Sequence, residues 1–263
     1  MSNLFDKYYA YFCAKKSKCR DSVKVTSDIL SVAGSLILRE DTNIPVIKVA
    51  GSLKHMGNIK AETVKVAGRL EVKNNLEAES ISVAGNLFVG NNLTANNLFK
   101  IAGSADVKGS IKGGKVKVAG RLKAADVECE YFRSSGKVIL EKLKADEVFI
   151  ELRSSKCHIN IIEGNDIEVK LQEEYEEDTV ARIISKTLSA LFECFSLEAL
   201  EREGKLYSSR IKGRNVYLEN TVCEIVEGDF VEIGPGCEIS KVVYKCDLTV
   251  HPEARVKESI KVS

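Results

Sequence analysis

The stretch Val66–Val83, which reads VAGRLEVKNNLEAESISV, holds one complete copy of a unit that recurs along this chain. Its opening tripeptide returns, with small changes, as Val32-Ala33-Gly34, Val49-Ala50-Gly51, Val66-Ala67-Gly68, Val83-Ala84-Gly85, Ile101-Ala102-Gly103 and Val118-Ala119-Gly120. The glycines of successive copies are 17, 17, 17, 18 and 17 residues apart. A fixed period this short is typical of a unit stacked on copies of itself, each contacting only its neighbours.

The unit divides into three short segments in which apolar and polar residues alternate. Polar residues such as Glu71 and Glu77 separate the apolar ones, which are Val66, Leu70, Val72, Leu76, Ala78, Ile81 and Val83. Alternation over so few residues indicates β-strands rather than helices. Gly68 and the pair Asn74-Asn75 fall between segments, where we expect positive φ at sharp corners. Three strands and three corners predict one turn of a triangular parallel β-helix, with turns about 4.8 Å apart.

Stacking such units places equivalent residues in columns along a rod. The first inward column is predicted to contain Val49, Val66, Val83, Ile101 and Val118. A second contains Leu53, Leu70, Leu87, Ala105 and Leu122, and a third contains Ile59, Leu76, Leu93 and Ile111. Burial of an aliphatic side chain contributes about 1.5–3 kcal/mol before entropy is counted. The columns therefore predict a rigid rod with almost no loops.

The pattern sets the expected domain boundaries in an all-β chain. It weakens after Gly120, loses one residue near residues 133–136, and is interrupted before it resumes. The four expected parts are an N-terminal tail, a main parallel β-helix, a short helical insertion and a smaller β-helical block, at residues 1–22, 23–172, 173–204 and 205–263. The last block either continues the same rod or forms a second one. We favour a separate short rod, because a helical pair usually marks a change of course.

The interruption has helical periodicity. Apolar residues at helical spacing predict an amphipathic helix, with Val180, Ile183, Ile184, Leu188, Leu191 and Phe192 on its apolar face. Ser196 is expected to cap a second, shorter helix that Gly204 ends. One interpretation is that the helices pack on the rod. The other is that the apolar face binds a partner protein through Ile184, Leu188, Leu191 and Phe192.

Composition excludes several classes of function. The chain has 39 basic and 38 acidic residues, a net charge of +1, which argues against nucleic acid as a partner. The sequence contains no run of about 18 apolar residues, the length that a membrane span needs. Residues 1–20 do not have the pattern of a signal peptide. The eight cysteines have neither a CxxC pair nor zinc-ligand spacing. They predict free thiols in a reducing cytoplasm.

Residues that carry chemistry are scarce. None of the three histidines, His55, His158 and His251, has neighbours in a recognisable catalytic arrangement, and His55 is expected in a corner. We therefore predict a protein that is not an enzyme, with no cofactor and no metal site. An outward column of Lys48, Lys65, Lys100 and Lys117 is either a solvated face or a weakly basic stripe for an anionic partner.

The N-terminal tail combines aromatic and basic residues. Aromatic side chains beside a basic cluster suit contact with an anionic membrane surface, here through Phe5, Tyr8, Tyr9, Phe12, Lys15 and Lys16. Two alternatives remain open: the aromatic residues cap the exposed first turn of the β-helix, or the tail is disordered.

The period, together with the corner phrases, resembles the bactofilin family. The matching phrases are Gly57-Asn58-Ile59-Lys60-Ala61-Glu62, Gly109-Ser110-Ile111-Lys112 and His251-Pro252-Glu253-Ala254-Arg255-Val256-Lys257. The resemblance covers residues 23–172 well and 205–263 loosely. It implies a right-handed β-helix that polymerises end to end, without nucleotide, into non-polar filaments that scaffold membrane or cell-wall machinery in the cytoplasm. The chain departs from the family in its helical insertion and in having no long C-terminal tail.

Physical reasoning about the ends of a rod also suggests self-association. End turns expose unpaired backbone and apolar side chains, which favour pairing with another copy. The residues expected there are Val23, Val25, Ile29, Ile260 and Val262. We therefore predict a cytoplasmic scaffold that associates with further copies of itself and with other scaffold or envelope proteins. The tail is expected to contact the membrane surface if the first interpretation of it holds. The alternative is a monomeric or dimeric interaction module that binds a partner through the insertion.

Overall fold

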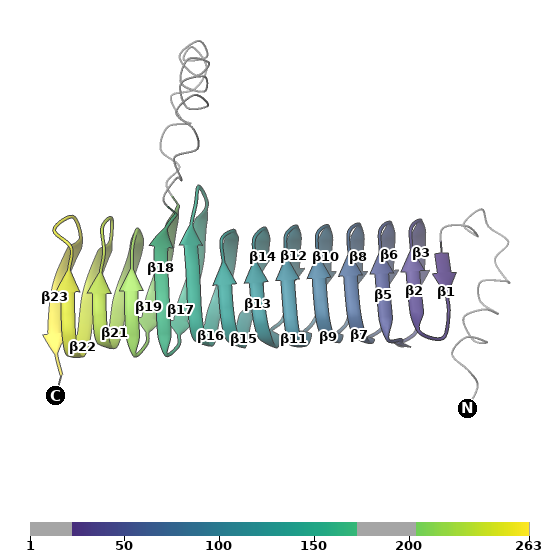
Figure 1. Ribbon diagram of the computed structural model, residues 1–263, viewed down its shortest axis with the longest axis horizontal. Coiled ribbons are helices and arrows are strands. Elements are labelled where there is room, and N and C mark those ends of the chain that lie inside the picture. Colours follow the sequence, from purple (N-terminus) through teal and green to yellow (C-terminus); the bar gives the residue numbers. More distant parts are fainter. Residues whose placement is uncertain (1–22, 173–203, 263) are drawn as a thin grey trace, which may run out of the picture.

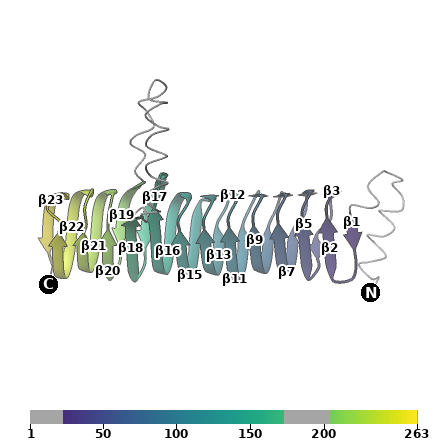
Figure 2. The same ribbon diagram turned by 45° about the horizontal axis from the view of Figure 1, so that its top comes forward.

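The computed structural model describes residues 23–172 and 204–262 as one long rod (Figures 1 and 2). All regular structure in these residues is β-strand, and none of them is helical. The strands form a parallel β-solenoid of about twelve turns, with one antiparallel pair at the N-terminal end. This arrangement confirms the predicted all-β parallel coil.

The strands of the N-terminal turns are β1 (Val23–Val25), β2 (Ile29–Val32), β3 (Ser35–Leu38), β4 (Thr42–Asn43), β5 (Val46–Val49), β6 (Ser52–His55), β7 (Ile59–Val66), β8 (Arg69–Val72), β9 (Leu76–Val83), β10 (Asn86–Val89), β11 (Leu93–Ile101) and β12 (Ser104–Val107). The remaining strands are β13 (Ile111–Val118), β14 (Arg121–Lys123), β15 (Asp126–Ser134), β16 (Lys137–Leu152), β17 (Lys156–Glu163), β18 (Asp166–Leu171), β19 (Lys205–Lys212), β20 (Asn215–Leu218), β21 (Thr221–Ile233), β22 (Glu238–Val250) and β23 (Arg255–Lys261).

Each turn contributes to three faces of the rod, as residues 63–79 illustrate. Face 1 contains residues 63–66, face 2 contains β8, and face 3 contains residues 76–78. Corner 1 joins face 1 to face 2 at Ala67-Gly68, and corner 2 joins face 2 to face 3 at residues 73–75. Between faces 3 and 1 the chain bends within continuous strands such as β7 and β9. A turn therefore has two corners and one bend within a continuous strand, rather than the three separate strands and three corners that the sequence predicted.

The inward columns form the core, as the alternation predicted. Val49, Val66, Val83, Ile101 and Val118 are all at most 3% exposed. The columns that begin at Leu53 and Ile59 are buried in the same way over the turns that the sequence assigned to them. Register pairing keeps each side chain above its equivalent, for example Leu70 between Leu53 and Leu87. Stacked aliphatic residues therefore fill the interior along the rod.

The glycines of corner 1 are required for a reason that differs from the expected one. Among the described residues, positive φ occurs only at Asn220 (46°) and Gly236 (70°), so Gly68 and Asn74-Asn75 do not adopt it. Instead, successive turns approach closely at this corner: a Cβ on Gly68 would lie 2.0 Å from the Gly51 carbonyl oxygen. The Gly68 amide also donates to the Val49 carbonyl oxygen at 3.0 Å. The glycine column is therefore a steric requirement of stacking.

The strands after residue 204 continue the same rod. β19 pairs in parallel with β17, and β20 with β18, so β19 and β20 stack directly on the turn before the interruption. The preference for a separate short rod was therefore wrong. The strands stop at corner 1 with Leu171 and resume after Gly204, where a Cβ would lie 1.9 Å from the Arg153 carbonyl oxygen. Gly204 thus has the stacking role of a corner 1 glycine.

The structure does not support the helical insertion predicted at residues 173–204. No described residue is helical, and residues 173–203 lie outside the described part of the chain. The missing residue of the repeat also lies elsewhere than expected. The register offset falls from 17 at Asp106↔Lys123 to 16 at Ile111↔Val127, so corner 2, and not residues 133–136, is shortened.

Candidate interaction surfaces

The N-terminal end of the rod is closed by a strand that runs against the direction of the coil. β1 pairs antiparallel with β2, with Val23 opposite Val32 and Val25 opposite Leu30. Val23 and Val25 are partly buried against the core, whereas Ile29 is on the outer side of face 1 and 36% exposed. The sequence placed all three in an exposed end turn, whereas β1 is an antiparallel cap and Leu30, next to Ile29, takes the inward position.

The C-terminal end differs, because its core columns reach the surface. Val250 continues the column of Ile233, which is fully buried, yet Val250 is 40% exposed. Val256 continues the column of Ile239 and is only partly buried. Among the described residues, the outer edges of β23 and of residues 247–250 have no strand partner. This end is therefore open.

Ile260 and Val262, which the sequence placed at the exposed end of the rod, lie in β23 and directly after it. The register aligns Ser259 with the buried Val242 and aligns Ile260 with the half-buried Val243. Val262 is 37% exposed, and its amide donates to the Tyr244 carbonyl oxygen. Neither side chain continues a buried core column, because the last segment of face 3 has a polar residue, Ser259, in the inward position.

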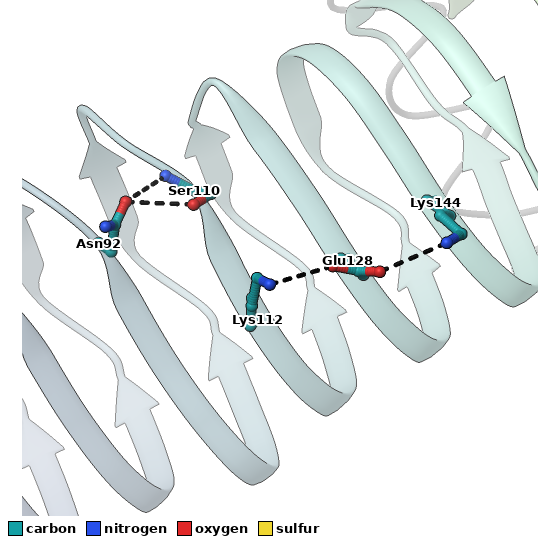
Figure 3. Close-up of polar contacts among 5 residues, drawn as sticks. All are labelled: Asn92, Ser110, Lys112, Glu128 and Lys144. Carbon is teal, nitrogen blue, oxygen red and sulfur yellow. Dashed lines mark hydrogen bonds and ion pairs between the residues drawn. The ribbon is translucent and has the colours of Figure 1, made fainter.

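Corner 2 carries a hydrogen-bond ladder that the sequence reasoning missed. Asn58 Oδ1 accepts from the Asn75 amide nitrogen at 3.2 Å and from Asn75 Nδ2 at 2.9 Å. The same pattern links Asn75 to Asn92 and Asn92 to Ser110, whose amide lies 3.0 Å from Asn92 Oδ1 (Figure 3). At the N-terminal end of the ladder, the Asn58 amide nitrogen donates to Asp41 Oδ1, and this hydrogen bond lowers the pKa of the Asp41 carboxyl. The sequence signal that could have predicted the ladder is the constant spacing of 17 residues between Asn58, Asn75 and Asn92.

Face 3 neutralises its charges between neighbouring turns. Glu128 accepts ion pairs from Lys112 and Lys144, each at 3.4 Å, so one carboxylate bridges three turns (Figure 3). Lys60 and Glu77 pair at 2.7 Å in the same way. These groups are solvent-exposed, so each pair contributes little to stability. Face 3 is a charged but balanced surface.

Face 1 separates its charges along the rod. One outward column runs through Ser31, Lys48, Lys65, Ser82, Lys100, Lys117, Arg133, Phe149, Glu168, Tyr217, Glu232 and Thr249. Its neighbour runs through Ile29, Val46, Thr63, Ser80, Leu98, Lys115, Tyr131, Glu147, Asp166, Asn215, Phe230 and Asp247. The sequence predicted the lysine column but not the acidic half, because turns of unequal length hide that part of the register.

The acidic half of face 1 also contains a shallow hollow. Aromatic side chains and carboxylates line it together, including Tyr131, Phe149, Tyr217 and Phe230. Phe149 is covered by the Arg133 guanidinium, which lies 4.9 Å from the ring centre and pairs with Glu151. The hollow is a groove between stacked side chains on an open face, and it offers no converging set of catalytic groups.

Face 2 has a second hollow beside a stacked pair of rings. His158 and Tyr207 lie 4.9 Å apart between ring centres, with an angle of 11° between their planes. Ile139 and Val222 continue this column on either side. Nearer the N-terminus, Lys73 and Lys108 both lie over the Phe88 ring. These contacts cover apolar surface with long side chains and hold no reactive constellation.

His55 is a core residue rather than a corner residue. It is fully buried on face 2, with Nε2 2.7 Å from Thr42 Oγ1 and Nδ1 accepting from the Gly57 amide at 3.2 Å. Since Nδ1 accepts, the ring proton of the neutral form is on Nε2 and is donated to Thr42. Burial lowers the pKa of His55. A neutral, fully bonded imidazole in the core has no access to a substrate.

Three of the described thiols are unsuited to nucleophilic chemistry because they are largely buried. Burial raises the pKa of Cys129 to about 12 and the pKa values of Cys223 and Cys237 to about 11. The thiolate is the reactive form, so these three side chains are inert near neutral pH. No group of His, Cys, Asp and Glu within residues 23–172 and 204–262 has the geometry to hold a metal ion.

Two predicted sites fall outside the described residues. They are the membrane-contact residues of the tail and the apolar face of the insertion, at Phe5, Tyr8, Tyr9, Phe12, Lys15, Lys16, Ile184, Leu188, Leu191 and Phe192. Both stay predictions. Within the part of the chain that the structure describes, no helix is long and apolar enough to cross a bilayer.

Comparison with known proteins gives one short similarity. The chain is 41% identical over 61 residues to the uncharacterized protein YhbF of Bacillus subtilis (strain 168). That stretch is 23% of this chain and 26% of YhbF, so the chain spans about a quarter of the length of the curated relative it matches. No family model matches the chain, and no solved structure matches it. The name of the relative assigns no activity, so the surfaces of the rod have to support any functional proposal.

Proposed function

We propose that this chain is a non-enzymatic scaffold protein of the bactofilin type, which self-associates through the end of its β-solenoid. The asymmetry between the two ends of the rod carries the proposal. In the first turn the core residues Leu30, Val32 and Leu38 are at most 3% exposed, whereas Val250 in the last turn is 40% exposed. An uncovered core next to unpaired strand edges favours association with another copy.

The open end is the stronger candidate for the assembly surface. There, residues 247–250 and β23 present backbone donors and acceptors, while Leu248, Val250 and Val256 continue the core columns. The closed end offers less, because β1 covers the edge of β2 with an antiparallel strand. The simplest assembly joins two open ends, so that one surface pairs with itself about a two-fold axis.

The test compares charged substitutions at the two ends of the full chain. We expect the wild type to sediment as a species larger than a monomer and to form elongated particles in negative-stain images. Val250→Lys together with Val256→Lys should abolish the end-to-end species with an unchanged circular dichroism spectrum, because charge blocks an edge strand. Lys24→Glu in the closed end is the control, since Lys24 is exposed in β1 and its reversal should leave assembly intact.

Two results would contradict the proposal. One is a wild type that is monomeric at every concentration tested, which would favour the discrete interaction module. The other is a Val250→Lys, Val256→Lys variant that assembles as the wild type and the Lys24→Glu control do. Membrane contact by the tail needs a separate measurement, in which deletion of residues 1–22 should abolish pelleting with anionic vesicles if that prediction holds.

A further inference from the structure

The two charge blocks of face 1 are exposed and mostly unpaired. Lys48, Lys65, Lys100, Lys115 and Lys117 are all exposed, and none has an ion pair within the described residues. In the acidic half, Glu147, Glu232 and Asp247 are likewise exposed without an ion pair among these residues. Face 3, by contrast, alternates lysine and glutamate and satisfies them internally. Face 1 therefore has charge complementarity that a single chain leaves unused.

We propose that face 1 is an interface between two copies of this chain, which lie side by side with their rods antiparallel. This arrangement brings the basic half of each copy against the acidic half of the other. It forms two identical contact zones about one two-fold axis, as symmetric dimers require. The proposal concerns the side of the rod and does not depend on association through the open end.

The register of the pairing follows from the turn order. Counting along face 1 from β2 as the first turn, Arg133 is in the seventh of twelve turns. A two-fold axis through that turn, parallel to the strands, sets the third turn opposite the eleventh, the fifth opposite the ninth and the sixth opposite the eighth. The same-column pairs that result are Lys65 with Glu232, Lys115 with Glu147, and Lys100 with Glu168, which also pairs with Lys170 of its own chain.

The remaining turns also lie opposite compatible turns. The fourth turn, with Ser80 and Ser82, lies opposite the tenth turn, with Asn215 and Tyr217. The second turn, with Lys48, lies opposite the twelfth, with Asp247. At the axis, Arg133 would face its own copy, but Glu151 of the same chain already neutralises it. A parallel arrangement would instead place lysine against lysine, which opposes association.

The shape and size of face 1 also suit such a contact. Exposed alanines line it near corner 1 at Ala50, Ala67, Ala84, Ala102 and Ala119, so two faces can approach closely. The turns stack along one straight axis (Figures 1 and 2). Twelve turns about 4.8 Å apart and four residues about 3.3 Å apart give a face of roughly 750 Å². A stable interface buries about 800 Å² per partner.

Zero-length cross-linking tests the register directly. Lys65 and Glu232 lie eight turns apart in one rod, about 38 Å at ~4.8 Å per turn, so a carbodiimide bond between them has to join two chains. We expect this cross-link in a mixture of isotope-labelled and unlabelled full chain, with mixed-isotope mass pairs. Its yield should fall several-fold between about 50 and 500 mM salt, because exposed charges are screened.

Charge reversal tests the complementarity. The variant Lys65→Glu, Lys100→Glu, Lys115→Glu and the variant Glu147→Lys, Glu168→Lys, Glu232→Lys should each lose the side-by-side dimer. An equimolar mixture of the two should restore it, because both contact zones then join opposite charges. A matched control, Lys123→Glu, Lys137→Glu, Lys156→Glu, reverses three exposed lysines on face 2 and should dimerise like the wild type.

The outcomes separate this interface from the open end. Loss of the dimer in both face 1 variants, with recovery on mixing, supports the proposal even if the Val250→Lys, Val256→Lys variant behaves as the wild type. Absence of the Lys65–Glu232 cross-link, or variants that associate like the wild type, overturns it. Binding of wild-type monomers to phosphatidylserine vesicles, lost in the lysine-reversal variant, would also overturn it by identifying an anionic surface as the partner.

Discussion

The N-terminal and C-terminal halves of the rod reach the same fold by different means. From Gly34 to Gly120 the turns are near copies, so one glycine column recurs at corner 1 and one asparagine ladder links corner 2 from Asn58 to Ser110. Beyond β18 the corners differ from one another, and a turn as short as the offset of 15 between Tyr217 and Glu232 occurs. In the repetitive half, the same residue type stabilises the equivalent corner of each turn. In the divergent half, each corner is stabilised by its own set of residues.

The corner at Glu219-Asn220 shows what such a local solution requires. Asn220 adopts positive φ, and its Nδ2 donates to the Gly204 carbonyl oxygen at 3.1 Å. Thr221, fully buried, donates its hydroxyl to the Glu219 carbonyl oxygen at 2.8 Å. Gly236, above Asn220, also has positive φ. The regular corners stack closely on glycine without positive φ. This corner instead uses positive φ at Asn220 and Gly236 together with buried side-chain hydrogen bonds.

The largest effect should come from a corner glycine of the regular half. In Gly85→Ala the new Cβ would lie 2.0 Å from the Gly68 carbonyl oxygen, which is backbone and cannot move alone. We expect a loss of about 2–3 kcal/mol, as for an overpacked core, in chemical denaturation. The matched Gly213→Ala meets only side-chain ends, of Val216 at 2.9 Å and Ile167 at 3.0 Å, and should cost less. Equal losses would contradict the distinction between the halves.

The asparagine ladder should give the next largest effect. Asn75→Ala removes the bond to Asn58 Oδ1 and the acceptor for the Asn92 amide, so we expect a loss of about 1 kcal/mol. Asn74→Ala, in the same corner, removes no side-chain hydrogen bond of the ladder and should leave the denaturation midpoint unchanged. If both variants lose the same stability, the ladder is not the cause.

The buried imidazole of the N-terminal half should make stability depend on pH. Burial lowers the pKa of His55 in the folded state below its unfolded value. Its contribution is therefore fully present above the unfolded pKa of about 6.5 and is lost as the pH falls through the folded pKa. Denaturation midpoints at pH 7.5 and 5 should differ less in His55→Val than in the wild type. His251→Gln, in an exposed corner, should retain the wild-type difference.

The smallest effect should come from the ion pairs of face 3. Glu128→Gln removes the bridge between Lys112 and Lys144, but all three groups are exposed. We expect a change within about 0.5 kcal/mol, because water and salt screen such pairs. Thermal unfolding at low and high salt checks this. A loss comparable to that of Asn75→Ala would show that the face 3 ladder contributes more than surface pairs usually do.

The sequence predicted what depends on the repeat alone. The alternation around Leu70, Val72 and Leu76 predicted the inward columns and the parallel stacking correctly, although strands such as β9 run through two of the three predicted segments. It failed where the outcome depends on how one turn meets the next. The proximity of Gly68 to the Gly51 carbonyl oxygen, and the Asn58–Asn75 hydrogen bonds, exist only between turns. A single unit therefore suggested φ preferences where stacking sets the requirement.

The ends and the surface charges were harder to predict, for a related reason. Alternation continues through Val23 and Val25, so nothing local shows that β1 runs antiparallel. Likewise, the pairing of Phe149 with Glu168 and of Tyr217 with Glu232 follows offsets of 19 and 15, which a fixed period cannot supply. The acidic half of face 1 became visible only when the register was known.

The place at which the strand sequence is interrupted, corner 1 between β18 and β19, has a practical consequence. β19 and β20 resume their pairing with β17 and β18 although the segment between residues 172 and 204 separates them in sequence. Because an equivalent corner recurs in every turn, foreign sequences grafted there would protrude at heights that differ by multiples of about 4.8 Å. Two groups attached at different corners of the rod can therefore be held at a chosen separation, in steps of about 4.8 Å.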